Sequence, residues 1–132
     1  MKFQPDSAPG VNLISRHDAD RVWVGATPFR HSIVVPWTGS VRRWDPASCD
    51  ALTADHFAAL LACNPELVIF GSGARLRFPP ASLLRPLIEA RVGVETMDTA
   101  AACRTYNVLA SEGRTVVAAL LLSEAATSPG TL

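Results

Sequence analysis

Apolar positions in the first third of the chain occur in three short runs, at residues 11–15, 22–24 and 29–35, with polar turns between them. Short runs that are rich in β-branched residues and bounded by turn residues are typical of strands. We therefore predict an N-terminal antiparallel β-meander, with residues 16–20 as its first turn. The next stretch, residues 37–50, is rich in turn formers and predicts a loop with one short edge strand at most.

From residue 53 onward, helical and strand patterns alternate. Apolar residues recur at intervals of three and four in three segments, which predicts helices at residues 53–64, 81–91 and 99–112. Runs of strand length lie at residues 67–70, 94–97 and 116–122. The first and last of these strands are apolar on both faces, as expected of strands covered by helices on each side.

Local signals mark where the predicted helices begin and end. Asp98 or Thr99 is a suitable N-cap for the third helix, and Gly93 is predicted to close the second. Pro86 falls within the second helix, where an interior proline costs about 3 kcal/mol. We therefore expect this helix to kink or to begin late, near residue 84 or 85.

The order of these elements predicts an α/β fold. The strand, helix and strand within residues 67–97 form a βαβ unit, whose strands should be parallel neighbours. We expect a single α/β domain over residues 1–132, with three layers: an N-terminal β-meander and then β-α-β-α-β, with helices on the faces of the sheet. A loose N-terminal arm, residues 1–10, and a disordered tail, residues 123–132, are expected at the ends.

Composition narrows the classes of function. Twelve basic and twelve acidic residues cancel, which argues against nucleic-acid binding, because such proteins usually carry a basic surplus. The N-terminus lacks the apolar segment of a signal peptide, and the run 116–122 is far shorter than the ~20 residues that span a bilayer. The cysteines Cys49, Cys63 and Cys103 show no zinc spacing. We predict a cytoplasmic protein with no membrane insertion, metal or cofactor.

Chemically capable side chains gather where two predicted parallel strands end. Ligands of open α/β sheets bind at the carboxyl ends of the strands. There, a Gly-Ser-Gly turn follows residue 70, and a helix start with free N–H groups and a positive dipole follows residue 98. Nearby arginines could help to bind an anion or a carboxylate. The candidate pocket consists of Gly71, Ser72, Gly73, Arg75, Thr99, Cys103, Arg104 and Asn107.

Each part of this pocket also has a purely structural interpretation. The Gly-Ser-Gly turn lacks the spacing of a dinucleotide- or phosphate-binding loop and fits a tight turn after a strand. Asp98 could cap the helix itself and repel an anion. Cys103 fits a packing residue, and Arg104 and Asn107 fit a solvated helix face. Because no general base can be paired with a nucleophile, no catalytic residue is assigned.

One segment resembles a known family. Residues 97–122, MDTAAACRTYNVLASEGRTVVAALLL, resemble the closing segment of a small single-domain family of unknown function that includes the mitochondrial complex I assembly factor three. The resemblance extends to residues 67–73, 22–25 and 33–36. It implies a three-layer α/β domain with a mixed sheet, in which the last strand is antiparallel to its neighbours. The family has no established catalytic residues, and its mitochondrial members look like assembly chaperones that act through protein partners.

Two functions follow as hypotheses. The favoured one is a non-enzymatic binding or assembly factor whose partner is a protein, such as a respiratory-complex subunit or another assembly factor. The alternative is a small-molecule-binding or anion-binding protein, or an enzyme, that uses the crevice at the carboxyl ends of strands 67–70 and 94–97. The absence of a nucleophile with a paired base favours the first.

Overall fold

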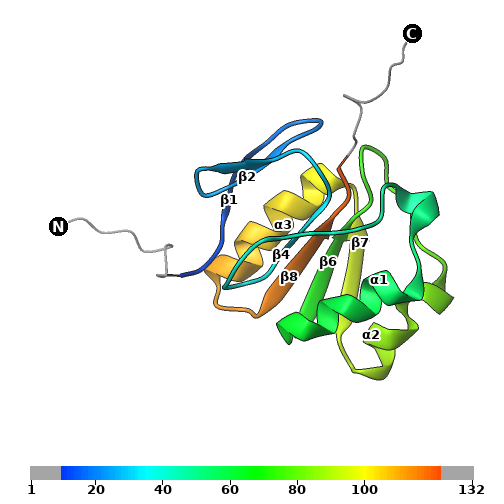
Figure 1. Ribbon diagram of the computed structural model, residues 1–132. Helices are drawn as coiled ribbons and strands as arrows, with labels where there is room; N and C mark the ends of the chain where they lie inside the picture. The colour runs from blue at the N-terminus through cyan, green and yellow to red at the C-terminus, as the bar shows by residue number, and fades with distance from the viewer. Residues whose placement is uncertain (1–9, 123–132) are drawn as a thin grey trace, which may run out of the picture.

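The computed structural model describes residues 10–122, which form two β-sheets and the helices that cover them (Figure 1). The predicted arm (apart from Gly10) and the predicted tail lie outside the described residues. The strands are β1 (Ile14–His17), β2 (Val22–Val24), β3 (Thr27–Phe29), β4 (Ile33–Val35), β5 (Arg42–Arg43), β6 (Leu67–Gly71), β7 (Gly93–Met97) and β8 (Val116–Leu120). The helices are η1 (Cys49–Ala51), α1 (Ala54–Ala58), η2 (Ala59–Cys63), η3 (Ala81–Leu84), α2 (Arg85–Glu89) and α3 (Thr99–Ser111), where η denotes a 3-10 helix.

The predicted meander exists as a three-stranded antiparallel sheet in the order β1-β2-β3. Its first strand lies later in the chain than expected. Arg16 and His17, predicted as a turn, pair with Trp23 and Val22, and an irregularity in the register lies between Ile14 and Arg16. The pairing extends β1 by these polar residues, whose pattern alone is typical of a turn.

The predicted strand at residues 29–35 is wrong, because the chain divides it between two sheets. Phe29 ends β3 in the small sheet, whereas Ile33–Val35 form β4 in the five-stranded sheet. All three residues of β4 are buried. A strand buried on both faces needs cover on both sides. Ile33 and Val35 pack with α3 and the small sheet, and Val34 packs on the side of α1 and α2.

The five-stranded sheet is mixed, in the order β5-β4-β8-β6-β7. β6 and β7 are parallel neighbours, as predicted. β8 lies between β4 and β6, antiparallel to the first and parallel to the second. The expectation that the last strand is antiparallel to its neighbours is therefore correct for β4 and wrong for β6. The physical reason is α3, which carries the chain from the end of β7 back to the edge where β6 begins.

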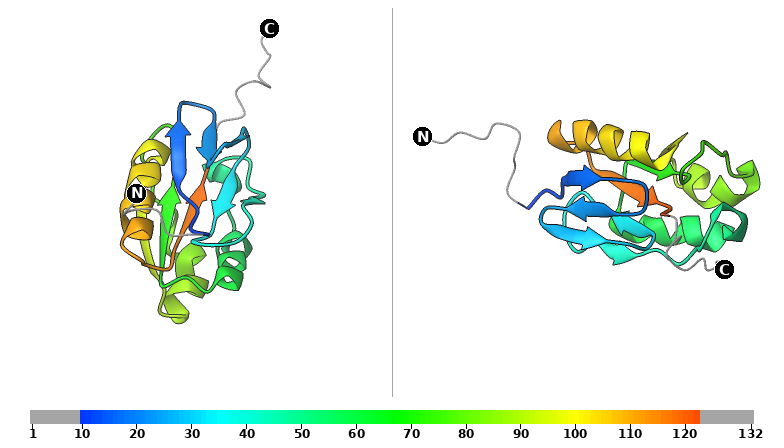
Figure 2. Two further views of the ribbon diagram at one scale, coloured as in Figure 1. Left: turned by 90° about the vertical axis from the view of Figure 1, so that its left-hand side faces the viewer. Right: turned by 90° about the horizontal axis from the view of Figure 1, so that it is seen from above.

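Helices cover both faces of this sheet, so the predicted three-layer α/β architecture with a mixed sheet is confirmed. Figure 2 shows α3 on one side of β8 and β6, with α1 and α2 on the other. Alternate residues of β8 supply the two cores. Val116, Ala118 and Leu120 pack with α3 and the small sheet, and Val117 and Ala119 pack with α1 and α2.

The helix boundaries follow local chemistry. Asp98 is the N-cap of α3, and its carboxylate accepts a hydrogen bond from the Ala101 N–H at 2.9 Å. η3 precedes α2, which begins at Arg85 with Pro86 in its first turn, so the expected late start is confirmed. Gly93 does not close α2 and instead begins β7. The left-handed residue after this helix is Arg91, with φ of 63°.

The small sheet is fastened to α3 by two neighbouring side chains. The side-chain Oδ1 of Asn107 accepts from the Ile14 N–H at 2.8 Å, and the side-chain Nδ2–H of Asn107 donates to the Ile14 carbonyl oxygen at 2.7 Å. The Tyr106 hydroxyl donates to the Asn12 carbonyl oxygen at 2.8 Å. These bonds fasten β1 and the residues before it to α3, which itself packs against β6 and β8 of the five-stranded sheet.

Candidate functional site

The carboxyl ends of β6 and β7 lie side by side, because Gly71 pairs with Met97 in the parallel register. The Ser72 N–H donates to the Met97 carbonyl oxygen at 2.8 Å. The Gly-Ser-Gly turn and the start of α3 therefore open on the same edge of the sheet, as the sequence predicts. What the edge can bind depends on which polar groups remain free there.

The Ser72 hydroxyl organises the loop that follows β6. It donates to the Arg75 carbonyl oxygen at 2.7 Å, with the Met97 carbonyl oxygen at 3.2 Å, and it accepts from the Arg77 N–H at 3.0 Å. Ser72 itself is buried. A hydroxyl engaged with three backbone groups is a structural element of the loop and has no base beside it to activate it as a nucleophile.

Thr99 closes the same edge from the side of α3. Its hydroxyl donates to the Leu121 carbonyl oxygen at 2.8 Å and accepts from the Gly73 N–H at 2.9 Å. A Cβ on Gly71 would lie 2.9 Å from the Thr99 hydroxyl oxygen. The space that Gly71 leaves is thus filled by Thr99, so this glycine serves the packing of the strand end against the helix.

The start of α3 carries its own negative charge, since the Asp98 carboxylate occupies the N-cap position. A hollow of about 440 Å³ lies between this helix start and the β1–β2 turn. Its polar lining includes His17, Asp18, Asp98 and Thr99. The carboxylates of Asp18 and Asp98 in this lining would repel an anion, which an uncapped helix N-terminus would otherwise attract.

A neighbouring hollow of about 380 Å³ is more basic. Ser72, Gly73, Arg75 and Arg77 line it together with Cys49. Arg77 is partly neutralised there, because its guanidinium donates to the Asp50 carboxylate at 2.7 Å. That ion pair raises the pKa of Arg77. Within residues 10–122, no ion pair engages Arg75.

The other candidate residues lie along α3, away from this turn. Cys103 is fully buried in the core, and burial raises the pKa of its thiol to about 12. Asn107 is engaged with Ile14, as described above. Arg104 lies on the exposed side of α3. The structure thus brings Gly71, Ser72, Gly73, Arg75 and Thr99 together at one edge of the sheet. Cys103, Arg104 and Asn107 lie farther along α3 and do not line the hollows at this edge.

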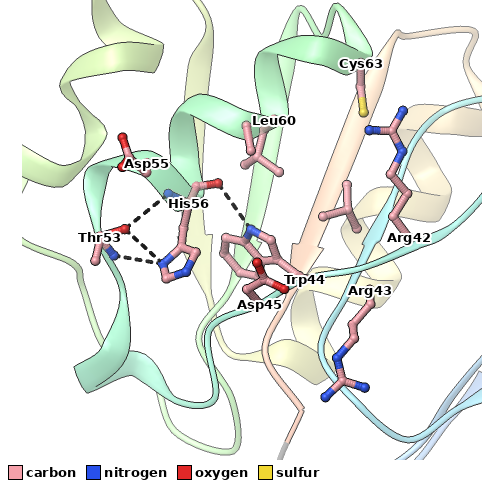
Figure 3. Close-up of a pocket in the computed structure, with 11 residues that line it drawn as sticks. Arg42, Arg43, Trp44, Asp45, Thr53, Asp55, His56, Leu60 and Cys63 are labelled. Carbon is pink, nitrogen blue, oxygen red and sulfur yellow. Dashed lines mark hydrogen bonds between the residues drawn. The ribbon is translucent and has the colours of Figure 1, made fainter.

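A third hollow, of about 450 Å³, lies between the β4–β5 edge and α1 (Figure 3). Trp44 is almost completely buried beneath it, and its Nε1–H donates to the His56 carbonyl oxygen at 3.2 Å. The Nδ1 atom of His56 accepts from the Thr53 N–H at 3.0 Å and completes a capping box. Arg42 and Cys63 lie across the hollow from His56 in Figure 3.

No expectation from the sequence covered this third hollow. The available signal was the spacing of Thr53 and His56, a variant of the Thr-x-x-Glu capping box with an imidazole in place of the carboxylate. Because Nδ1 accepts, the neutral imidazole carries its proton on Nε2. Among residues 10–122, no cluster of three or more His, Cys, Asp or Glu side chains could hold a metal ion.

The chain matches a known family. A model of the protein family of unknown function DUF498/DUF598 matches residues 14–121. The chain belongs to this family. The human NADH dehydrogenase (ubiquinone) 1 alpha subcomplex assembly factor 3 is 34% identical over 91 residues, which are 67% of this chain and 50% of the human protein. The chain therefore spans about half the length of that relative, and the resemblance carried by residues 97–122 is confirmed.

Solved structures and a further relative extend the comparison. The crystal structure of a protein from Bordetella parapertussis superimposes with a TM-score of 0.80 at 37% identity, over 89% of this chain and 100% of that chain. A "13 kDa major membrane protein" of Francisella tularensis is 27% identical over 117 residues, 88% of this chain and 95% of its own. In residues 10–122 of this chain, no helix is long and apolar enough to cross a bilayer.

Proposed function

We propose that this protein is a non-enzymatic binding factor that assists the assembly of NADH dehydrogenase by holding a protein partner. The human relative is named as an assembly factor of NADH dehydrogenase, which supports the partner class. The chemistry of the strand ends supports the non-enzymatic part, because the hydroxyls of Ser72 and Thr99 are engaged with backbone groups. We expect the protein to act in the cytoplasm.

The observation that carries this proposal is an ordered loop with exposed apolar side chains. Leu76 is 52% exposed and Phe78 is 72% exposed. The hydroxyl of Ser72 fixes the loop in front of them, and the prolines at 79 and 80 favour an extended chain behind them. Apolar residues held in place on the surface lose little conformational entropy on binding, which is the character of a protein-contact site.

The positions of the other exposed apolar residues along the chain support the same segment. The described residues expose four large hydrophobic side chains, and three of them, Leu76, Phe78 and Ile88, fall in the short stretch from the end of β6 to α2. The fourth, Val108, lies on α3. We therefore assign the partner surface to residues 76–88 and use Val108 as an internal control.

Affinity purification from a native lysate under mild crosslinking tests the proposal. The tagged wild-type chain should recover a stoichiometric NADH dehydrogenase subunit or assembly factor. The double variant Leu76→Ser/Phe78→Ser should recover about tenfold less, since removing exposed anchor residues costs an interface at least ~1.4 kcal/mol. Val108→Ser should behave as wild type. Repeated recovery of the chain alone would overturn the proposal.

The basic hollow favours one alternative function, the binding of an anionic small molecule beside Arg75. Ligand binding would raise the melting temperature, because a ligand that binds only the native state stabilises it. A thermal-shift screen of phosphates and carboxylates should then find a compound whose effect Arg75→Ala abolishes and Arg104→Ala leaves intact. A flat screen at millimolar concentration would remove this alternative.

A further inference from the structure

The five-stranded sheet ends at β7 (Gly93–Met97), which hydrogen-bonds to β6 and has no strand on its other side within residues 10–122. The Gly93 N–H donates to the Glu66 carbonyl oxygen, and the Met97 carbonyl oxygen accepts from the Ser72 N–H. Backbone groups alternate in direction along a strand. The N–H and C=O groups of Val94 and Thr96 therefore point away from the sheet.

These outward groups make no hydrogen bond to the rest of the described chain. Within residues 10–122, no hydrogen bond joins the backbone of Val94 or Thr96 to a segment outside the sheet. Natural edge strands are usually protected by proline, charged side chains, a bulge or a covering element. β7 has no proline, its register with β6 is regular over all five pairs, and Glu95 is its one charged residue. Such an edge is suited to pair with another strand.

Glu95, the charged residue at the centre of β7, determines which kind of strand can pair with this edge. Glu95 is exposed, whereas the neighbouring Val94 and Thr96 are half-buried on the opposite face. In an antiparallel pair of two copies that uses both outward residues, Val94 would face Thr96 and Glu95 would face Glu95. Directly opposed like charges destabilise a strand pair, and opposite charges stabilise it. A second copy of this chain is thus a poor occupant of the edge.

We propose that β7 docks an extended segment of a partner protein, antiparallel to β7, with a Lys or Arg opposite Glu95 and apolar or β-branched residues on either side. This inference rests on the proposed function, since it supplies a second contact for the same protein partner. The main-chain bonds come from Val94 and Thr96, and the preference for a basic residue comes from Glu95. A strand pairing of this kind leaves the rest of the fold unchanged.

A peptide titration tests the edge without a known partner. The probe is acetyl-TVRVT-amide, and the matched control is acetyl-TVEVT-amide. The backbone amide signals of Val94 and Thr96 should shift most in the NMR spectrum of the labelled chain, with the Arg peptide binding about fivefold more tightly. Glu95→Lys should reverse this preference. Shifts centred on another segment, or an equal affinity for both peptides, would overturn the proposal.

A backbone variant separates this inference from the proposed function. Thr96→Pro removes one outward N–H, which the fold does not use, and proline is tolerated at edge positions. Thr96→Ala retains that N–H and serves as the control. In the affinity purification, Thr96→Pro should lose partner recovery and Thr96→Ala should retain it. If Thr96→Pro and wild type recover the partner equally, docking at β7 is refuted and the proposed function stands. If the wild-type chain recovers no partner, the proposed function is refuted, and the peptide titration alone decides whether β7 docks a strand.

Discussion

Gly71 shows how closely the end of β6 meets the start of α3. A Cβ at this position would lie 2.9 Å from the Thr99 hydroxyl oxygen and 3.0 Å from the Thr99 Cα, which is backbone and cannot give way easily. At Gly93, by contrast, the nearest atom is the end of the Leu67 side chain at 3.1 Å. The two glycines therefore form a matched pair for substitution.

Gly71→Ala should lower the free energy of unfolding by about 1–3 kcal/mol, because inserting a methyl group into a packed site forces the backbone to move. Gly93→Ala should cost less, since a leucine side chain can rotate. Urea denaturation of both variants measures the difference. An equal loss at the two positions would contradict the packing role assigned to Gly71.

Cys103 lies at the centre of the core, and burial raises the pKa of its thiol to about 12. Because the thiolate is the reactive form, Cys103 should resist alkylation in the native protein at neutral pH. The partly exposed Cys49 and Cys63 should react first. Mass spectrometry after a short iodoacetamide treatment checks this order, and modification of Cys103 as fast as Cys49 would refute it.

The buried Cys103 thiol also predicts a loss of stability at high pH. The ordinary pKa of the thiol is 9.0. Between that value and about 12, the unfolded chain releases the proton while the folded chain retains it, so the free energy of unfolding falls as the pH rises. The loss from pH 9 to pH 10 should be about 1 kcal/mol. Cys103→Ala should abolish this part of the pH dependence, and a pH-independent difference between the two proteins would contradict it.

At the residue scale, the positions of Ser72 and Thr99 could be predicted from the sequence, whereas the hydrogen-bond partners of their hydroxyls could not. Ser72 and Thr99 were placed correctly at the strand ends, because the βαβ pattern brings those ends together. The partners of their hydroxyls, including the Leu121 carbonyl oxygen, come from β8 and from the loop. A local pattern carries no information about such long-range contacts. From the sequence, Cys103 could be either a pocket residue or a packing residue. Its complete burial in the structure identifies it as a packing residue.

At the scale of elements, α3 links the two sheets through Asn107. Its side-chain amide pairs with both the N–H and the C=O of Ile14 in β1. Asn107→Ala should lower the free energy of unfolding by about 1–3 kcal/mol, because it leaves partly buried backbone groups without partners. The Ile14 amide should also exchange its hydrogen faster.

Arg104→Ala is the control for this prediction. Arg104 lies on the same helix and is exposed, so its loss should change stability by less than about 0.5 kcal/mol. If Asn107→Ala leaves both the stability and the exchange of Ile14 unchanged, β1 is held to α3 by packing alone.

The starts of the second and third helices could be predicted from the sequence, whereas the end of the second helix and the sheet that Ile33–Val35 joins could not. Asp98 and Pro86 act within one turn of their own positions, and both had the effects that local chemistry predicts. The run at residues 29–35 looked continuous, yet it divides between two sheets. Which sheet a strand joins is decided by distant partners, here β8 for Ile33–Val35.

At the scale of the whole molecule, the α/β class and the parallel β6–β7 pair followed from the order of elements. The insertion of β8 between β4 and β6 did not, because both neighbours of that strand are distant in sequence. The same topology leaves β7 at an edge of the sheet. In the loop after β6, Leu76 and Phe78 are exposed. The engaged hydroxyls of Ser72 and Thr99 and the exposed side chains of Leu76 and Phe78 are the features on which we base the proposed protein-binding role.

The most direct test of this role is the amount of assembled NADH dehydrogenase in cells from which the chain has been deleted. We predict a specific loss of the assembled enzyme on native gels, with other respiratory complexes unchanged. The wild-type chain and Val108→Ser should restore assembly, and Leu76→Ser/Phe78→Ser should not. A normal amount of assembled NADH dehydrogenase in the deletion strain would contradict the proposed function.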